Sequence, residues 1–260
     1  MRTAGLQTLF TGQQVTVLKT IDSTNSYLNN LLAEHRLPEG AVIMAEEQTA
    51  GRGLASEKWV SEPGKNLLMS IVFYPSFLST RNLFLLSKAF SLGVYDGVKN
   101  LLRNAGENKM VKIKWPNDIY IGDKKLCGIL IENSIRNPNV NHTLLGIGLN
   151  VNQQDFPPTL QNPVSLKMIL DTEQTIDGCF ASLCNSIESR YLQLKAGHID
   201  RINEDYLSAL FRLGEFHRYE SNSERFNAKI TAIADDGKIF LRHENGLIGK
   251  YDFKEVKFVF

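Results

Sequence analysis

The sequence predicts an α+β protein in which a larger mixed domain, residues 1–213, precedes a small all-β domain, residues 214–260. In the larger part, segments with apolar residues at helical spacing alternate with short apolar runs typical of strands. After Gly214, apolar residues alternate with polar ones instead. Two strong hairpin turns, Asp236-Gly237 and Asn245-Gly246, divide this last part into short strands. We expect a mixed β-sheet flanked by helices, followed by a small barrel of the SH3 type.

The first unit of the larger domain is a strand followed by a helix. Residues 15–18 form the predicted strand, and Asp22-Ser23-Thr24-Asn25 supplies side chains suited to the helix N-cap. A polar, glycine-bearing loop, residues 46–65, follows between two buried strands, residues 41–45 and 67–73. Its place between two strands makes this loop a candidate for ligand binding.

A long amphipathic helix and several further elements complete the larger domain. Apolar residues recur at helical spacing throughout residues 83–102, where Gly93 and Gly97 either weaken the helix prediction or mark a close packing contact. We expect further strands at 111–114, 119–121, 126–131 and 143–151, and helices at 165–170, 176–194 and 199–210.

Composition excludes several classes of protein. Hydrophobic residues make up 43% of the chain and charged residues 22%, values typical of globular proteins. The net charge of +1 predicts no bulk attraction to nucleic acid or to an anionic membrane. No signal peptide and no membrane span are recognisable. The three cysteines, Cys127, Cys179 and Cys184, lack the spacing of metal ligands, so we expect reduced thiols and a cytoplasmic protein.

A cation flanked by two glycines lies in the polar loop. In Gly51-Arg52-Gly53 the glycines allow the backbone to approach a ligand closely, and the guanidinium offers a forked donor for phosphate or carboxylate. A flexible surface loop with a solvated arginine is the alternative.

A second cationic segment spans residues 114–118. Its Pro116 cannot donate a hydrogen bond and interrupts strand pairing, and Asn117 and Asp118 favour a turn with outward-facing side chains. Lys125 begins the next strand and can converge on the same pocket. There it would neutralise the charge that accumulates when a carboxylate attacks a phosphate. The pattern indicates ATP-dependent activation of a carboxylic acid, with an ordinary edge lysine as the alternative.

Two common nucleotide-binding motifs are absent. The segment beginning Gly146-Ile147-Gly148 has Val151 where a dinucleotide fingerprint needs its third glycine, and no P-loop sequence occurs. The hydroxyls of Ser23 and Thr24 are either helix caps or ligands for a heterocycle. An ATP site in this chain must be built in another way.

These motifs, in this order, resemble the biotin–protein ligases. The similarity covers about residues 15 to 260, and it lies in five ordered segments: 22–25, 48–53 with Trp59, 114–118, 125–130 and 146–152. The resemblance implies the ligase-like mixed sheet and the SH3-like module. It also implies a biotin site formed by Ser23, Thr24, Asn25, Gln48, Gly51, Arg52, Gly53, Leu54 and Lys125. The implied ATP site consists of Arg52, Trp59, Lys114, Asn117, Asp118, Lys125 and Asn150.

The resemblance implies a two-step reaction with Lys125 and Arg52 as the catalytic cations. Biotin and ATP would form biotinyl-AMP and pyrophosphate, and biotin would then pass to a lysine of a biotin carboxyl carrier domain. Ser23, Thr24 and Gln48 would bind the ureido ring of biotin. Mg²⁺ is expected on the ATP phosphates rather than on protein ligands. A homodimer is compatible with the family.

The chain departs from the family pattern in two places. After Gly53, the segment Leu54-Ala55-Ser56-Glu57 replaces a further polar or basic residue, and the Leu54 side chain cannot donate to an adenylate. Only about 14 residues precede the first strand, too few for a helix-turn-helix reader, so we expect no operator binding.

Two other functions stay open from the sequence. A lipoate–protein ligase or octanoyl transferase would share the fold and the lysine, although their Arg-Arg-x-x-Gly-Gly-Gly segment is absent here. A non-catalytic adaptor would use the β module to recruit partners, but it has no need of Arg52, Asn117 and Lys125 together.

Overall fold

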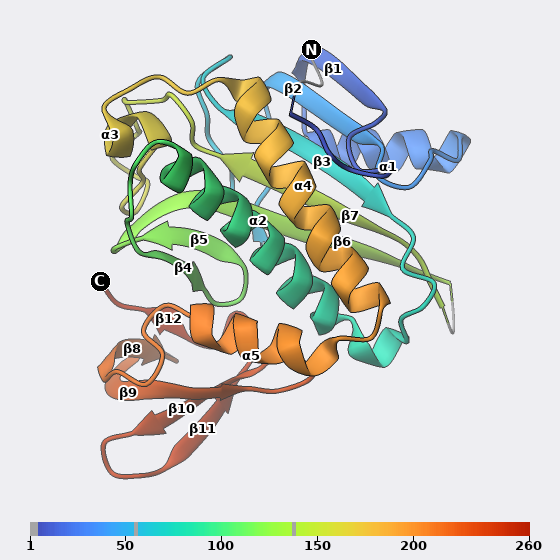
Figure 1. Cartoon of the computed structure of the whole chain (residues 1–260). Helices are drawn as coiled ribbons and strands as arrows, with labels where there is room; N and C mark the ends of the chain where they lie inside the picture. The colour runs from blue at the N-terminus through green and yellow to red at the C-terminus, as the bar shows by residue number, and fades with distance from the viewer. Residues whose placement is uncertain (1–4, 55–56, 137–138) are drawn as a thin grey trace.

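The computed structural model describes residues 5–54, 57–136 and 139–260, and it has an α+β architecture with two sheets (Figure 1). The first sheet is mixed, with strand order β1-β2-β3-β7-β6-β5-β4. Only the β1–β2 pair is parallel, and the other neighbours are antiparallel. Its strands are β1 (Val15–Ile21), β2 (Val42–Gln48), β3 (Leu67–Phe73), β4 (Val111–Lys114), β5 (Asp118–Ile121), β6 (Lys124–Arg136) and β7 (Asn139–Leu149).

Helices cover this sheet unequally on its two faces. The helices are α1 (Thr24–Glu34), the 3₁₀ helix η2 (Thr80–Asn82), α2 (Phe84–Asn104), α3 (Leu166–Leu170), α4 (Ile176–Lys195) and α5 (Ile199–Ala209). The long helices α2 and α4 lie side by side over one face (Figure 1). The shorter α1 covers part of the other face, where Leu28 packs in a small separate core cluster. The rest of that second face is left for the site.

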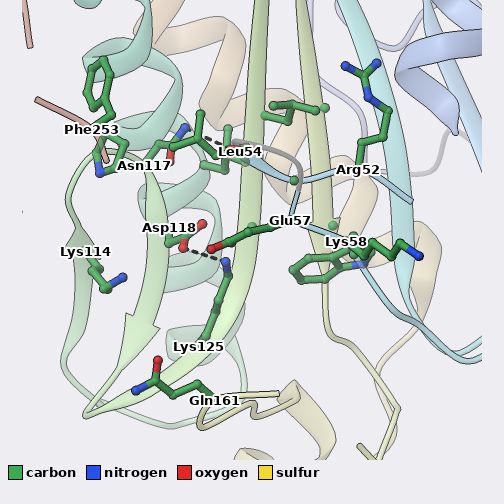
Figure 2. Close-up of a pocket in the computed structure, with 18 of the residues that line it drawn as sticks. Arg52, Leu54, Glu57, Lys58, Lys114, Asn117, Asp118, Lys125, Gln161 and Phe253 are labelled. Carbon is green, nitrogen blue, oxygen red and sulfur yellow. Dashed lines mark hydrogen bonds and ion pairs between the residues drawn. The ribbon is translucent and has the colours of Figure 1, made fainter. Parts of the chain in front are cut away.

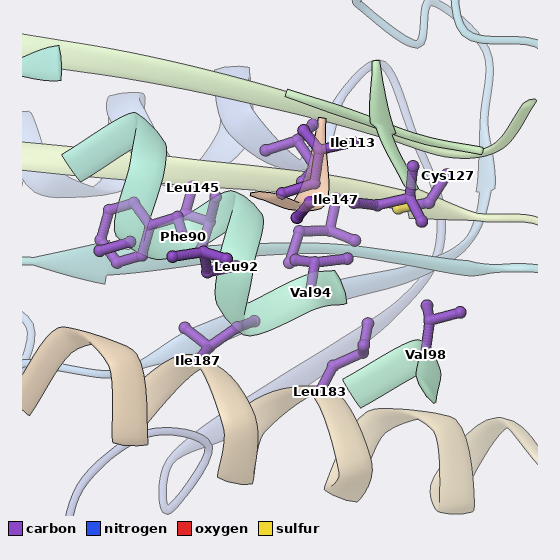
Figure 3. Packing of buried hydrophobic residues seen from close by; sticks show 14 of the residues in the cluster. Phe90, Leu92, Val94, Val98, Ile113, Cys127, Leu145, Ile147, Leu183 and Ile187 are labelled. Atoms are coloured by element: carbon purple, nitrogen blue, oxygen red, sulfur yellow. The ribbon is translucent and has the colours of Figure 1, made fainter. Parts of the chain in front are cut away.

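Glycines bring α2 and α4 close together. A Cβ added at Gly93 would lie 2.6 Å from the Cα of Ile187, and one at Gly97 would lie 2.6 Å from Leu183 Cδ2. Figure 3 shows Leu183 and Ile187 of α4 directed at α2 and at the sheet beyond it. Close packing of this kind increases the apolar area that each helix buries.

Side-chain alternation along the central strands separates the core from the site. Because successive residues of a strand point to opposite faces, Leu145 and Ile147 of β7 enter the main core beneath α2 and α4. The intervening Gly146 and Gly148 therefore lie on the opposite face. On β3, Ser70 takes the same position between two buried apolar residues, Met69 and Ile71. Around Ser70, Gly146 and Gly148 the second face thus carries small or polar residues, opposite the large apolar residues of the first face.

The second sheet is antiparallel and follows α5. Its order is β11-β10-β9-β8-β12, and its strands are β8 (His217–Ser221), β9 (Glu224–Ile233), β10 (Ile239–His243), β11 (Ile248–Tyr251) and β12 (Lys257–Phe258). Trp115 joins the two sheets, since its Nε1 donates to the carbonyl of Gly237 at 2.9 Å and its ring stacks on Phe253. The second sheet is therefore held against the β4–β5 turn.

Each predicted strand and helix of the larger domain corresponds to an element of the structure, but several strand bounds differ. The strand expected at 15–18 continues to Ile21, and the strand expected at 41–45 runs from Val42 to Gln48, into the expected polar loop. The strands expected at 126–131 and 143–151 are longer at the hairpin end, because β6 continues to Arg136 and β7 begins at Asn139. The added residues are mostly polar, and pairing across the hairpin stabilises them without an apolar run. Within the described part of the chain, no helix is both long and apolar enough to cross a membrane.

Candidate functional site

A cavity of about 570 Å³ opens on the second face of the mixed sheet. Its walls come from the start of α1, the polar loop after β2, the β4–β5 turn and the last residues of the second sheet (Figure 2). The cavity lining includes the predicted residues Ser23, Thr24, Asn25, Gln48, Arg52, Gly53, Leu54, Trp59, Lys114, Asn117, Asp118 and Lys125. Segments that are distant in the sequence therefore meet in one place.

One end of the cavity is a buried hydrogen-bond network. Gln48 Oε1 accepts from the backbone N–H of Thr24 at 2.7 Å and from its hydroxyl at 3.0 Å. Ser70 Oγ lies 2.7 Å from Thr24 Oγ1 and 2.5 Å from Asn25 Oδ1. Ser23 is the N-cap residue of α1, but its side chain makes no capping hydrogen bond. These groups provide donors and acceptors for a polar ring.

Replacing Ser70 with alanine tests this network. The change removes the hydroxyl that lies between Asn25 Oδ1 and Thr24 Oγ1, so one of these buried oxygens loses its donor. We expect about 1–3 kcal/mol less unfolding free energy and weaker binding of biotin, the ligand that the sequence resemblance implies. Urea unfolding and titration calorimetry measure the two effects. Ser91→Ala is the matched control, because the buried Ser91 hydroxyl has no hydrogen-bond partner among the described residues. Equal effects of the two substitutions would contradict the role of Ser70.

Glycines of the sheet form the floor of the cavity, and the ring of Trp59 lies directly against two of them. A Cβ added at Gly128 would lie 2.7 Å from Trp59 Cζ3, and one at Gly148 would lie 2.7 Å from Trp59 Nε1. At Gly146 an added Cβ would lie 2.5 Å from Asn25 Oδ1. The indole N–H of Trp59 is buried and unpaired within the described part of the chain. The three glycines therefore leave room on the sheet for the indole ring and for the Asn25 amide.

Lys125 lies at the centre of the cavity and is held by its neighbours. Its Nζ is 2.6 Å from Asp118 Oδ2 and 5.8 Å from the centre of the Trp59 ring. Its backbone donates to the carbonyl of Asn162 and accepts from the N–H of Val164. Figure 2 shows Glu57 pointing toward the same ammonium group. The lysine is thus fixed at both its backbone and its charged end.

The surroundings of the two cavity lysines have opposite effects on their pKa values. For Lys125, burial favours the neutral form, but the charge and the hydrogen bond of Asp118 outweigh it and raise the pKa. For Lys114, burial dominates and lowers the pKa, although Asp118 acts in the other direction. Lys114 Nζ lies 5.1 Å from the centre of the Phe258 ring. Lys125 is therefore the more firmly charged of the two at neutral pH.

Arg52 lines the same cavity as Lys125, but its guanidinium points elsewhere. Arg52 Nη2 lies 2.6 Å from Glu132 Oε1, and Figure 2 shows the group directed away from Lys125. The two cations thus share a cavity, while their charged groups do not meet in this structure. The sequence analysis did not identify Glu132 as the partner of Arg52.

Three predicted positions differ from what the sequence suggested. The side chain of Asn117 faces inward, not outward, because its Nδ2 donates to the carbonyl of Ile129 at 3.0 Å. Asn150 does not line the cavity, since its Nδ2 donates to the carbonyl of Val164 and so supports the segment beside Lys125. Gly51 lies behind the lining, where an added Cβ would meet the carbonyl of Trp59. Ala55 and Ser56 of the loop lie outside the described residues.

The second sheet contributes lining residues that the sequence analysis missed. Phe253 and Lys254 come from the loop before β12 and Phe258 from β12, and Phe253 packs directly on Trp115 of the β4–β5 turn. Phe260 stacks on Tyr120 of β5, with ring centres 5.9 Å apart. The only sequence signal for this contact is the concentration of aromatic residues near the end of the chain.

Comparisons with known proteins agree with this geometry. Residues 17–150 match the Biotin/lipoate A/B protein ligase family. The "Bifunctional ligase/repressor BirA" of Bacillus spizizenii is 31% identical over 249 residues, which are 94% of this chain and 74% of that protein. The "Biotin--[acetyl-CoA-carboxylase] ligase" of Paracoccus denitrificans is 29% identical over 88% of this chain and 95% of that protein.

A solved structure shows that the fold is shared along the whole chain. The biotin protein ligase from Aquifex aeolicus, in complex with biotin and ATP, superposes with a TM-score of 0.78 at 24% identity. The match covers 95% of this chain and 100% of that one. Together with the sequence matches, this shows that the chain belongs to the Biotin/lipoate A/B protein ligase family.

Proposed function

We propose that this protein is a biotin protein ligase, which forms biotinyl-AMP from biotin and ATP and transfers biotin to a lysine of a carrier domain. The observation that carries the proposal is that one cavity contains both a buried polar network, at one end, and Lys125, at the centre. The names of relatives that span most of the chain support biotin rather than lipoate as the substrate.

Biotin fits the cavity in one orientation. Its ureido ring offers two N–H donors and one carbonyl acceptor, which complement the Ser23 and Thr24 hydroxyls and the Gln48 amide. Its apolar ring and chain would lie on the glycine floor beside Trp59. This places the carboxylate toward Lys125, the firmly charged group of the cavity.

The reaction needs charge stabilisation more than proton transfer. A carboxylate oxygen of biotin attacks the α-phosphorus of ATP, and the bond from that phosphorus to pyrophosphate breaks. Lys125 stabilises the negative charge that develops between carboxylate and phosphate, and Arg52 contributes a second cation. The neutral amine of the acceptor lysine then attacks the acyl carbon, and AMP leaves.

The remaining predicted residues would form the ATP side of the cavity. Lys114, Asn117 and Asp118 lie on the β4–β5 hairpin and line the same cavity as Trp59 and the last residues of the chain. Asn150 acts indirectly in this proposal, by holding the segment beside Lys125. Mg²⁺ would enter as part of the MgATP substrate, because this cation is commonly bound through substrate phosphates.

The organisation of the chain suits this activity. Residues 1–213 would be the catalytic domain, and residues 214–260 an SH3-like module that closes one side of the cavity. Three free, buried cysteines support a reducing cytoplasm. The partner is the biotin carboxyl carrier domain of a carboxylase, and the net charge of +1 supports the absence of a DNA-binding role. A homodimer is also proposed, supported by β1 as an edge strand of the mixed sheet.

Mass spectrometry of a carrier domain tests the proposal. The protein is incubated with ATP, a purified biotin carboxyl carrier domain, and either biotin, lipoate or octanoate. We expect the carrier to gain one biotinyl group only when biotin and ATP are both present. Modification with lipoate or octanoate alone would favour the other members of the family, and no modification by any acid would favour an adaptor.

A further inference from the structure

We infer that Glu132 is a positioning residue that holds Arg52 away from the reacting groups until an anionic substrate competes for the guanidinium. This inference rests on the proposed function, since it assigns Arg52 to the carboxylate and phosphate oxygens. Glu132 itself does not line the main cavity.

The contact between the two side chains is forked. Arg52 Nη2 lies 2.6 Å from Glu132 Oε1, and Arg52 Nη1 lies 3.4 Å from Glu132 Oε2. The hydroxyl of Ser26 accepts from the same Nη1 at 3.4 Å. A paired guanidinium and carboxylate of this kind form a directional, charge-assisted interaction. Arg52 is therefore fixed in one position rather than free in solvent.

Arg52 lies between two cavities. It lines the main cavity with Lys125, and it also lines a second cavity of about 410 Å³ that contains Glu132. Its side chain can therefore change from one anionic partner to another by rotation, without a change in the sheet. Its backbone stays paired with Lys58 across the loop.

Glu132 is also connected to the polar end of the main cavity. Asn25 Nδ2 donates to Glu132 Oε2 at 2.8 Å, and Asn25 Oδ1 lies 2.5 Å from Ser70 Oγ. Because Ser70 Oγ also lies 2.7 Å from Thr24 Oγ1, one hydrogen-bonded chain runs from Arg52 to the proposed ureido site. The carboxylate of Glu132 is thereby held in place by a side chain of the biotin site itself.

The exposure of the pair shows that it is weak enough to be replaced. The Arg52 side chain is 47% exposed and that of Glu132 is 33% exposed. Ion pairs this accessible to water are screened, so a phosphate or carboxylate in the main cavity can displace Glu132. Removing the charge of Glu132 is expected to change substrate affinity by about two- to five-fold.

Limited trypsin digestion without substrates tests the restraint directly. Trypsin cuts after Arg52 only when this side chain leaves its partner, so we expect cleavage there to be several-fold faster in E132Q than in the unaltered protein. E173Q is the matched control, because it removes the carboxylate of another ion pair, Glu173 with Lys167 at 3.0 Å. Equal cleavage at Arg52 in all three proteins would overturn the inference.

The same restraint can be tested on the unaltered protein, so this second test does not require any variant to fold. Salt weakens an exposed ion pair, so cleavage after Arg52 should accelerate with ionic strength more than cleavage after Lys254, which forms no ion pair within the described part of the chain. The same salt dependence at both residues would count against the restraint.

Kinetics then show whether the restraint affects the reaction. In biotin-dependent pyrophosphate exchange, we expect E132Q to lower the KM for ATP by about two- to five-fold, with the largest difference at low salt. E132D, which keeps the charge, should lie between E132Q and the unaltered protein. An unchanged or higher KM in E132Q would contradict the inference. If the unaltered protein shows no exchange with biotin, the proposed function fails, while the trypsin result still tests the restraint.

Discussion

Replacing Lys125 with alanine should lower the rate of biotinyl-AMP formation by about 10²- to 10³-fold, the loss expected when one stabilising donor is removed from a developing anion. Lys125 is the central cation of the cavity, and Asp118, at 2.6 Å from its Nζ, raises its pKa despite burial. Biotin-dependent pyrophosphate exchange measures this rate. The loss should fall on kcat more than on the KM for biotin, because the ureido contacts are unchanged.

A neighbouring lysine provides the control for this substitution. Lys124 is exposed at the start of β6 and does not line the cavity, so Lys124→Ala should leave exchange unchanged. Because Lys125→Ala also leaves Asp118 without its ion-pair partner, thermal unfolding should be measured for both variants. Exchange by a folded Lys125→Ala protein at the rate of the Lys124→Ala protein would remove the catalytic role of Lys125.

Replacing Gly148 with alanine should raise the KM for biotin by more than about ten-fold. The added Cβ would lie 2.7 Å from Trp59 Nε1 and closer still to the ring carbon beside it. At these distances the added Cβ and the ring overlap, so the indole must move off the sheet floor. The proposed position of the apolar part of biotin is thereby lost.

Binding of biotin to the Gly148→Ala protein can be measured by calorimetry, together with its thermal unfolding. Leu145→Val on the same strand is the control, because Leu145 points into the core on the other face. That variant should lose stability by about 1 kcal/mol and keep its affinity. Normal biotin affinity in the Gly148→Ala protein would show that the floor does not contact the substrate.

Much of the fold follows from local patterns in the sequence. The apolar run of β3 and the helical spacing of apolar residues in α2 predicted these elements, because buried positions are occupied mainly by apolar residue types. Gly93 and Gly97 indicated that a close packing contact was possible, but the sequence did not identify α4 as the partner. The polar half of the β6–β7 hairpin could not be predicted from the sequence, because backbone pairing there does not require apolar residues.

Less of the site could be predicted from the sequence, because its main contacts join segments that are distant along the chain. Arg52 and Glu132 are 80 positions apart, and nothing near either residue indicates the other. Gly128 and Gly148 lie against the indole of Trp59, which comes from a loop far upstream. A search for known glycine motifs excluded a dinucleotide fingerprint and a P-loop, but it could not reveal this contact. Asn150 belongs to a predicted motif but supports the backbone near Lys125, since a buried amide must satisfy its own hydrogen bonds.

A crystal structure with biotin and a non-hydrolysable ATP analogue would test the site most directly. We expect Lys125 Nζ and the Arg52 guanidinium to contact oxygens at the same junction between the biotin carboxylate and the α-phosphate. Arg52 would have left Glu132, while the ureido ring would lie against Thr24 and Gln48. A complex in which both substrates are bound and the two cations contact separate groups, or Arg52 stays on Glu132, would contradict the account.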